Sequence, residues 1–160
     1  MAENLRFANG IEALALMATE PEKYRTSQAL ASAMATNPVV VRRLLSALSH
    51  AGLVTSVKGP TGGSRLAKSA KQITMRDVYR AVSAGDLLHR GTHDSEDMHD
   101  LRKAVHGVFK KAQKRFEEEL DSTTLHQLIK KSGKKLAKAS PETLREKASP
   151  DRAGGASASD

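Results

Sequence analysis

Residues 36–52, TNPVVVRRLLSALSHAG, contain the start, the body and the end of one short helix. Asn37 is a favourable N-cap, Pro38 stands where proline is welcome, at the first helical position, and Gly52 suits the C-terminal end. The helix predicted over 38–50 has two distinct faces. The face expected to point into the core (the core stripe) consists of Val41, Leu44, Leu45 and Leu48. The outer face consists of Val39, Arg42, Arg43 and Ser46.

The segments on either side of this helix predict a winged helix-turn-helix. Upstream, helices are expected over 5–18 and 27–34, the second with Thr26 as its N-cap. Downstream, strands 53–57 and 64–67 are expected to pair as a hairpin, because the run KGPTGG between them favours a turn. The predicted fold class is therefore mainly α with a small β-hairpin wing.

The C-terminal half is expected to add a long dimerisation helix to this winged helix-turn-helix. A helix capped by Thr74 and Asp77 comes first, and a much longer one should run from Asp94 or Ser95 to about Asp121. A helix of that length is poorly covered by so small a domain, so pairing with a second subunit is expected. The expected dimer interface consists of Met98, Leu101, Val105, Val108, Phe109, Ala112, Phe116 and Leu120. A last helix is predicted over 123–131.

The positive charge is concentrated in one segment of the 160 residues. The whole chain has a net charge of +8, and residues 25–80 contain nine Lys or Arg against a single acid, Asp77. Clustering of this kind indicates a polyanionic partner, here double-stranded DNA. No apolar run is long enough to span a membrane and no signal peptide is recognisable, so we expect a cytoplasmic protein.

These patterns divide the chain into four expected parts. They are a DNA-binding winged helix-turn-helix domain at 1–83, a loop at 84–97, the dimerisation and C-terminal helices at 98–132, and a disordered basic tail at 133–160.

The stretch AGLVTSVKGPTGG, residues 51–63, resembles the IscR-type (Rrf-two) family of bacterial transcription regulators. Supporting similarity lies in Arg6-Phe7-Ala8, in 44–48 and in Thr123-Thr124-Leu125, so that the resemblance covers about residues 3–131. It implies a homodimeric winged-helix protein whose third helix enters the major groove and whose wing reaches the minor groove. It also implies repression of genes, often including the regulator's own.

Two departures from the family pattern bear on function. Members that bind an iron–sulfur cluster carry three cysteines before the long helix, whereas this chain contains none, so no cofactor is expected. Lys58 stands where the family usually has a wing arginine, and Ser64 where it usually has an aromatic residue. Arginine suits a narrow minor groove better than lysine does.

Arg42 and Arg43 are placed to contact base edges or phosphates, and Lys58 and Arg65 flank the wing turn. The turn glycines would let the backbone approach a phosphate. The alternative for the two helix arginines is an ordinary solvated face. The expected DNA-binding residues are Thr26, Ser27, Gln28, Asn37, Val39, Val40, Arg42, Arg43, Lys58, Gly59, Pro60, Gly62, Gly63 and Arg65.

Other functions are less well supported by the sequence. No catalytic motif is present, so an enzyme is not expected. His89, His93 and His99 are weak candidates for metal ligands, but their spacing matches no metal signature and a hydrated loop explains them equally well. The leading hypothesis is a homodimeric repressor that binds an inverted-repeat operator. The alternatives are a protein-interaction module and a nonspecific nucleic-acid binder, and the signal could be a small ligand, a partner protein or none.

Overall fold

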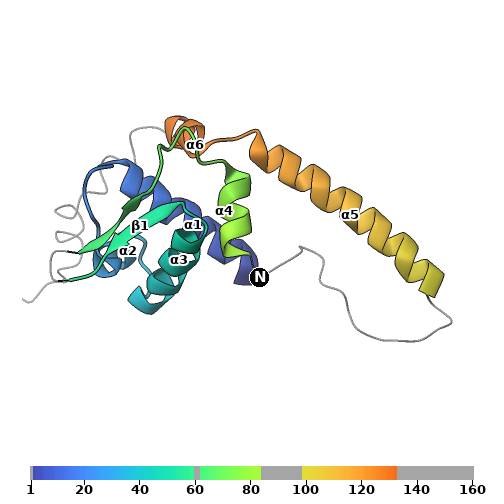
Figure 1. Ribbon diagram of the computed structural model, residues 1–160, viewed down its shortest axis with the longest axis horizontal. Helices are drawn as coiled ribbons and strands as arrows, with labels where there is room; N and C mark the ends of the chain where they lie inside the picture. The colour runs from blue at the N-terminus through green and yellow to red at the C-terminus, as the bar shows by residue number, and fades with distance from the viewer. Residues whose placement is uncertain (1, 60–61, 84–98, 133–160) are drawn as a thin grey trace, which may run out of the picture.

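The computed structural model describes residues 2–59, 62–83 and 99–132, and Figure 1 shows their arrangement. The elements in chain order are α1 (Ala2–Ala18), α2 (Ser27–Ala33), α3 (Pro38–His50), β1 (Val54–Val57), β2 (Gly63–Leu66), α4 (Met75–Val82), α5 (His99–Asp121) and α6 (Leu125–Ser132).

Three helices begin at the caps that the sequence predicts. The Thr26 hydroxyl accepts a hydrogen bond from the Ala29 amide at 3.1 Å, and Asn37 Oδ1 accepts one from the Val39 amide at 2.8 Å. At α4, Thr74 and Asp77 form a reciprocal capping box. Each bond satisfies a backbone amide that has no partner within its helix, which sets where the helix begins.

The core lies where α1, α3 and α4 meet, with α2 and the hairpin packed around them (Figure 1). Its largest fully buried side chains are Leu14, Met17, Leu30, Leu48, Leu53, Ile73, Leu125, Val41, Val78 and Val82. Burial of one such side chain contributes about 1.5–3 kcal/mol. The core stripe predicted for α3 is confirmed, because all four of its residues are buried.

Gly10 allows α1 and α4 to approach closely. A Cβ at this position would stand 3.2 Å from Val78 Cγ1 and 3.4 Å from Val82 Cγ1. Glycine costs about 0.5–1 kcal/mol relative to alanine inside a helix, so its place in α1 is explained by packing rather than by helix propensity.

The hairpin is antiparallel, with Val54 opposite Leu66 and Val57 opposite Gly63. Two helices, a third helix with an exposed face, and this hairpin form a winged helix-turn-helix, so the predicted fold class is confirmed. No helix in the described part of the chain has the length and apolar character needed to cross a bilayer.

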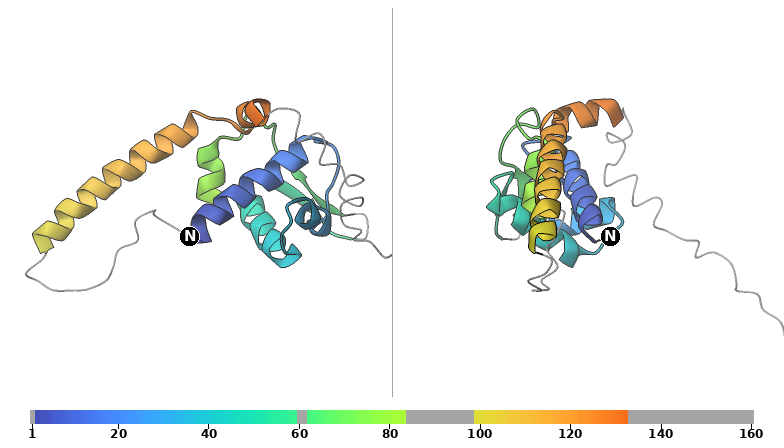
Figure 2. Two further views of the ribbon diagram at one scale, coloured as in Figure 1. Left: turned by 180° about the vertical axis from the view of Figure 1, so that it is seen from behind. Right: turned by 90° about the vertical axis from the view of Figure 1, so that its right-hand side faces the viewer.

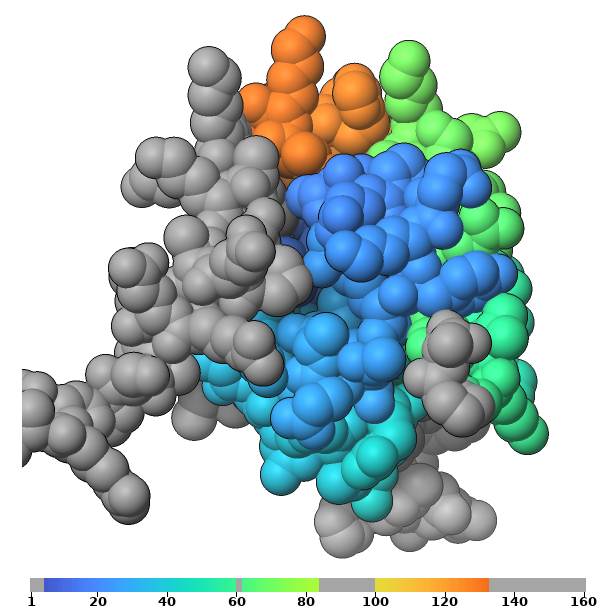
Figure 3. Space-filling view, turned by 90° about the vertical axis from the view of Figure 1, so that its left-hand side faces the viewer, coloured from blue at the N-terminus to red at the C-terminus, as the bar shows by residue number. Residues whose placement is uncertain are grey.

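The helix α5 projects away from this domain, and it is attached to the domain at its C-terminal end (Figures 1 and 2). There residues 123–126 are joined to 70–75 by backbone hydrogen bonds, including Met75 N to Thr123 O at 2.9 Å and Leu125 N to Ile73 O at 2.8 Å. These bonds use the backbone of 123–124 in a β-bridge, so α6 begins at Leu125 and not at the predicted Thr123. The helix then packs beside α1, as the orange and blue surfaces in Figure 3 show.

Several predictions concern residues outside the described ranges. They are the loop at 84–97, the cap of the long helix at Asp94 or Ser95, and the disordered tail at 133–160. The other boundaries shift slightly: α1 already begins at Ala2, and α2 ends at Ala33 instead of Met34, whose φ of −91° and ψ of 1° start the turn to α3.

Candidate nucleic-acid interface

The exposed face of α3 is the central feature of the candidate site. Val39 and Val40 are 46% and 43% exposed, and Arg42 and Arg43 are also exposed. The opposite face is anchored in the core, so the helix holds these side chains outward on a rigid support. Exposed valines can contact thymine methyl groups, and guanidinium groups can bind guanine or phosphate.

The turn from α2 to α3 sets the angle of this helix. Ala35 adopts a φ of 50°, in the left-handed region where glycine is the usual residue. The Thr36 amide donates to the Ala31 carbonyl at 2.9 Å, which closes the end of α2.

The start of α2 was also predicted to contact DNA, through Thr26, Ser27 and Gln28. Thr26 and Gln28 are exposed, and Ser27 is half-buried.

Most basic residues of segment 25–80 already have an acidic partner. Ion pairs join Arg65 to Glu22, Lys68 to Asp77, Arg76 to Asp121, and Arg80 to Glu117. Within the described ranges, Arg42, Arg43 and Lys58 form no ion pair. The positive charge that remains uncompensated therefore includes the outer face of α3 and the wing.

Arg25 is a base of segment 25–80 whose charge is not available to DNA. It counts among the nine bases, but its side chain is only 8% exposed and is paired with Glu20. Its Nη2 also donates to Thr19 Oγ1 at 3.0 Å. A buried guanidinium with these partners is structural, so Arg25 contributes little to a DNA-facing surface.

The backbone of Arg25 also anchors the wing. Its amide donates to the Ser64 carbonyl at 2.9 Å, and the Ser64 amide donates back to the Arg25 carbonyl at 2.8 Å. A Cβ on Gly63 would lie 2.7 Å from that Arg25 carbonyl oxygen, and one on Gly62 would lie 2.2 Å from the Val57 carbonyl oxygen. Both glycines are therefore explained by close contacts within the chain. The sequence had suggested a different reason for them, namely that the backbone could approach a phosphate. Gly59, with a φ of 117°, is needed for the turn itself.

The side chain of Arg65, in the wing strand β2, is held by two residues that sequence reasoning did not single out. Its Nη1 donates to Glu22 Oε2 at 2.8 Å, and its guanidinium stacks over the Tyr24 ring at 5.0 Å. Glu22 is 43 residues away in sequence, so no local pattern indicates the pair. Because Glu22 is 92% exposed, the pair is weak and a phosphate could replace the carboxylate.

The predicted dimer residues form an exposed apolar stripe along α5. Leu101, Val105, Val108 and Phe109 are 56%, 40%, 64% and 41% exposed. At the anchored end, Phe116 makes an edge-to-face contact with Tyr79 at 5.2 Å between ring centroids, and Leu120 packs on the core of its own chain. These two residues therefore also attach α5 to the domain. Ala112 is exposed, and Met98 lies outside the described residues.

The salt bridge from Arg80 holds α5 to α4 beside these rings. Its Nε donates to Glu117 Oε2 at 2.8 Å. A hydrogen bond from Gln113, followed by the Arg80 contact, lowers the pKa of Glu117 below its ordinary value of 4.5, although partial burial acts in the opposite direction.

The side chains of the weak metal candidates all fall outside what the structure describes. His89 and His93 lie outside the described residues, and the side chain of His99 is not described. Among the side chains that are described, no group of His, Asp or Glu has the arrangement to hold a metal ion.

The geometry agrees with the similarity of this chain to known proteins. The Rrf2 family model, described as an iron-dependent transcriptional regulator, matches residues 4–131. YwnA of Bacillus subtilis (strain 168), named for an inferred role as an HTH-type transcriptional regulator, is 32% identical over 131 aligned positions, covering 79% of this chain and 96% of YwnA.

Two solved structures show the same arrangement. That of IscR from T. potens is 26% identical with a TM-score of 0.60, covering 81% of this chain and 86% of IscR. That of CymR, the global cysteine regulator of B. subtilis, is 25% identical with a TM-score of 0.58, covering 78% of this chain and 93% of CymR.

Proposed function

Because the chain belongs to the Rrf2 family, whose members are transcriptional regulators and not enzymes, we propose that it is a homodimeric repressor acting on an inverted-repeat operator. In this proposal α3 enters the major groove, and the wing contacts phosphates or the minor groove. Such a protein works beside the chromosome, in the cytoplasm.

One observation carries the DNA-binding part of the proposal. Arg42 and Arg43 have no acidic partner within the described ranges, whereas five other bases of the segment do. Both unpaired arginines belong to the exposed face of the helix that follows the α2–α3 turn. An uncompensated guanidinium pair on a rigid helix is suited to an anionic groove.

The exposed stripe of α5 supports the dimer. An apolar surface of this extent is unfavourable in water, and the same stripe on a second copy would cover it. Two copies related by a twofold axis would present two α3 helices, which is the reason to expect an inverted repeat.

An iron–sulfur cluster held by cysteine thiolates does not fit this chain. The family description refers to iron, but the sequence contains no cysteine and so lacks every thiolate ligand. We therefore assign no step of regulation to such a cluster.

Alanine substitutions separate base contacts from phosphate contacts. We expect Arg42→Ala or Arg43→Ala to cost about 1–3 kcal/mol on the cognate operator and to relax the preference at one position in each half-site. Lys58→Ala should weaken cognate and random DNA equally and reduce the salt slope by about one unit. Titrations of labelled operator and random duplex at several salt concentrations measure both effects.

Lys103→Ala is the matched control, since it removes an exposed charge on the side of α5 opposite the apolar stripe. Lys103→Ala should change neither the cognate-to-random affinity ratio nor the salt slope. If both arginine variants retain the cognate-to-random affinity ratio, α3 does not contact bases. Equal affinity of the parent for the two duplexes would instead favour a nonspecific nucleic-acid binder.

A further inference from the structure

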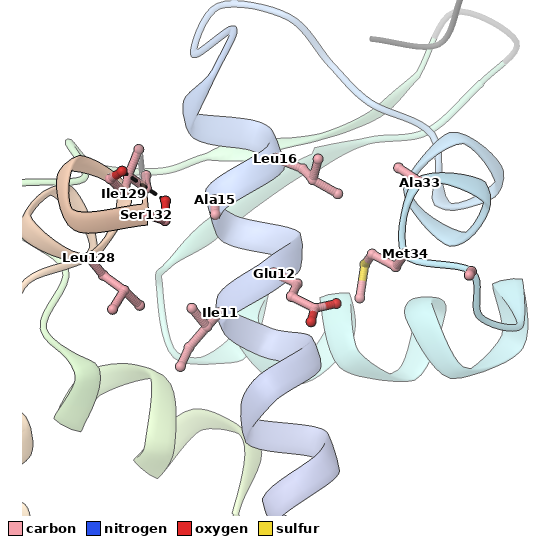
Figure 4. Close-up of a pocket in the computed structure, with 10 residues that line it drawn as sticks. Ile11, Glu12, Ala15, Leu16, Ala33, Met34, Leu128, Ile129 and Ser132 are labelled. Atoms are coloured by element: carbon pink, nitrogen blue, oxygen red, sulfur yellow. Dashed lines mark hydrogen bonds between the residues drawn. The ribbon is translucent and has the colours of Figure 1, made fainter. Parts of the chain in front are cut away.

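A groove of about 590 Å³ lies on the face of α1 between α6 and the α2–α3 turn (Figure 4). Ile11, Glu12 and Ala15 of α1 form its floor. Leu128 and Ile129 of α6 line one side, and Met34 lines the other. Its volume lies within the roughly 300–1,000 Å³ typical of small-molecule sites.

The lining of the groove is mostly apolar but includes a carboxylate. Most of the wall consists of aliphatic side chains and the Met34 thioether, and Ser132 adds a hydroxyl; among the described residues that line the groove, Glu12 is the one that is ionisable. Figure 4 shows the Glu12 carboxylate extending from α1 toward Met34. Glu12 is exposed, so water solvates its carboxylate, and within the described ranges it forms no ion pair. An apolar ligand with a positive charge would satisfy both the walls and the carboxylate, whereas an anion would be repelled.

The two sides of the groove belong to elements with different tasks. Met34 and Ala35 form the turn that sets the angle of α3, and Ala35 holds its left-handed φ there. On the opposite side, α6 follows the anchored end of α5 after a connection of three residues, 122–124. A ligand between them would therefore act on the placement of α3 relative to the long helix.

We propose that this groove binds a small apolar organic cation, such as a hydrophobic amine paired with Glu12, and that its occupancy lowers the affinity for DNA. The first part of this proposal, that the groove binds the amine (the binding half), stands independently of the function proposed above. The second part, that the amine lowers the affinity for DNA (the regulatory half), rests on that function. Linkage then requires that DNA lowers the affinity for the amine by the same factor.

The binding half is tested on the full chain without DNA, using two naphthalene probes of similar shape and opposite charge. Titration calorimetry with 1-naphthylmethylamine should show saturable binding at one site per chain, about threefold tighter than 1-naphthylacetate, because the Glu12 carboxylate is exposed. The net charge of +8 favours the anionic probe elsewhere on the protein. A preference for the amine is therefore specific to an acidic site.

Variants locate the site within the groove. Glu12→Gln should remove the preference for the amine, whereas Glu118→Gln, an exposed carboxylate on α5, should leave it unchanged. Ala33→Leu, which adds volume to a lining residue, should weaken both probes. Absence of saturable binding, equal or tighter binding of the acetate, or an unchanged Glu12→Gln would overturn the proposal. So would amine binding that falls as the protein concentration rises, because a second copy would then occupy the groove.

The regulatory half is measured with the operator duplex. Saturating amine should lower the affinity of the parent for the operator at least about threefold and leave that of Glu12→Gln unchanged. An unchanged parent affinity overturns this half alone. If the chain binds no DNA at all, the proposed function fails, while the titration without DNA still decides whether the groove is a site.

Discussion

Ala35 and Gly52 show how single backbone angles end the two helices of the helix-turn-helix. Both residues have a positive φ, 50° for Ala35 and 68° for Gly52, but only Gly52 lacks the Cβ that makes this region costly. Nothing stands within 4 Å of a Cβ built on Gly52, so its conformation alone requires glycine.

Opposite substitutions at these positions should have opposite effects on stability. Gly52→Ala should lower the free energy of unfolding by about 1 kcal/mol, and Ala35→Gly should raise it by up to about 1 kcal/mol, less the entropy that glycine adds to the unfolded chain. Urea unfolding at constant m-value measures both. Gly107→Ala, inside α5 with open space around it, is the control and should stabilise slightly. A neutral Gly52→Ala would contradict the strain argument.

At the scale of elements, the wing is anchored where the backbone of β2 meets that of Arg25. A methyl group on Gly63 would meet the Arg25 carbonyl, so β2 must shift away from the segment that anchors it. We expect Gly63→Ala to cost about 1–3 kcal/mol of stability and to weaken operator binding with no change in charge. Thermal unfolding and operator titration together measure this. Lys58→Ala is the comparison, because it should alter the salt slope and leave the melting temperature unchanged. A fully stable Gly63→Ala would show that the wing is not held there.

The contacts of Glu117, first with Gln113 of its own helix and then with Arg80 of α4, should make the stability depend on pH. The folded pKa of Glu117 is lowered, so its contribution is complete above the unfolded value near 4.5 and is lost as the pH falls through the folded pKa. The difference in melting temperature between the parent and Glu117→Gln should therefore shrink below pH 4.5. It should correspond to no more than about 1 kcal/mol at neutral pH, because Arg80 is largely exposed. A pH-independent difference would mean that packing and not charge accounts for the effect.

At the scale of the whole molecule, the projecting α5 is the feature on which the proposed dimer rests. Val105→Glu or Phe109→Glu places a charge in the exposed stripe and should convert a dimer to a monomer of 17.2 kDa. Light scattering of each variant beside the parent measures the mass. Lys103→Glu, on the opposite side of the helix, should leave the dimer intact. A parent that is already monomeric would contradict the dimer proposal.

The sequence by itself determined the features that arise from contacts between near neighbours in the chain. Caps such as Asn37 and the Thr74–Asp77 box act within one helical turn, and apolar periodicity identifies the buried face of α3. Because these signals are local, the order of elements, most helix boundaries and the winged helix-turn-helix could all be predicted. The two arginines on α3 follow from the same periodicity.

Only the tertiary structure decided which charges are available and which glycines are required. Arg25 is buried against Glu20, Arg65 is paired with a residue 43 positions away, and Gly63 faces the Arg25 backbone. The groove at Glu12 likewise joins residues from the two ends of the described chain. A charge is neutralised by whatever the fold brings near it, and a close backbone approach depends on two distant segments meeting. Neither leaves a pattern in the local sequence, so both appear only once the chain is folded.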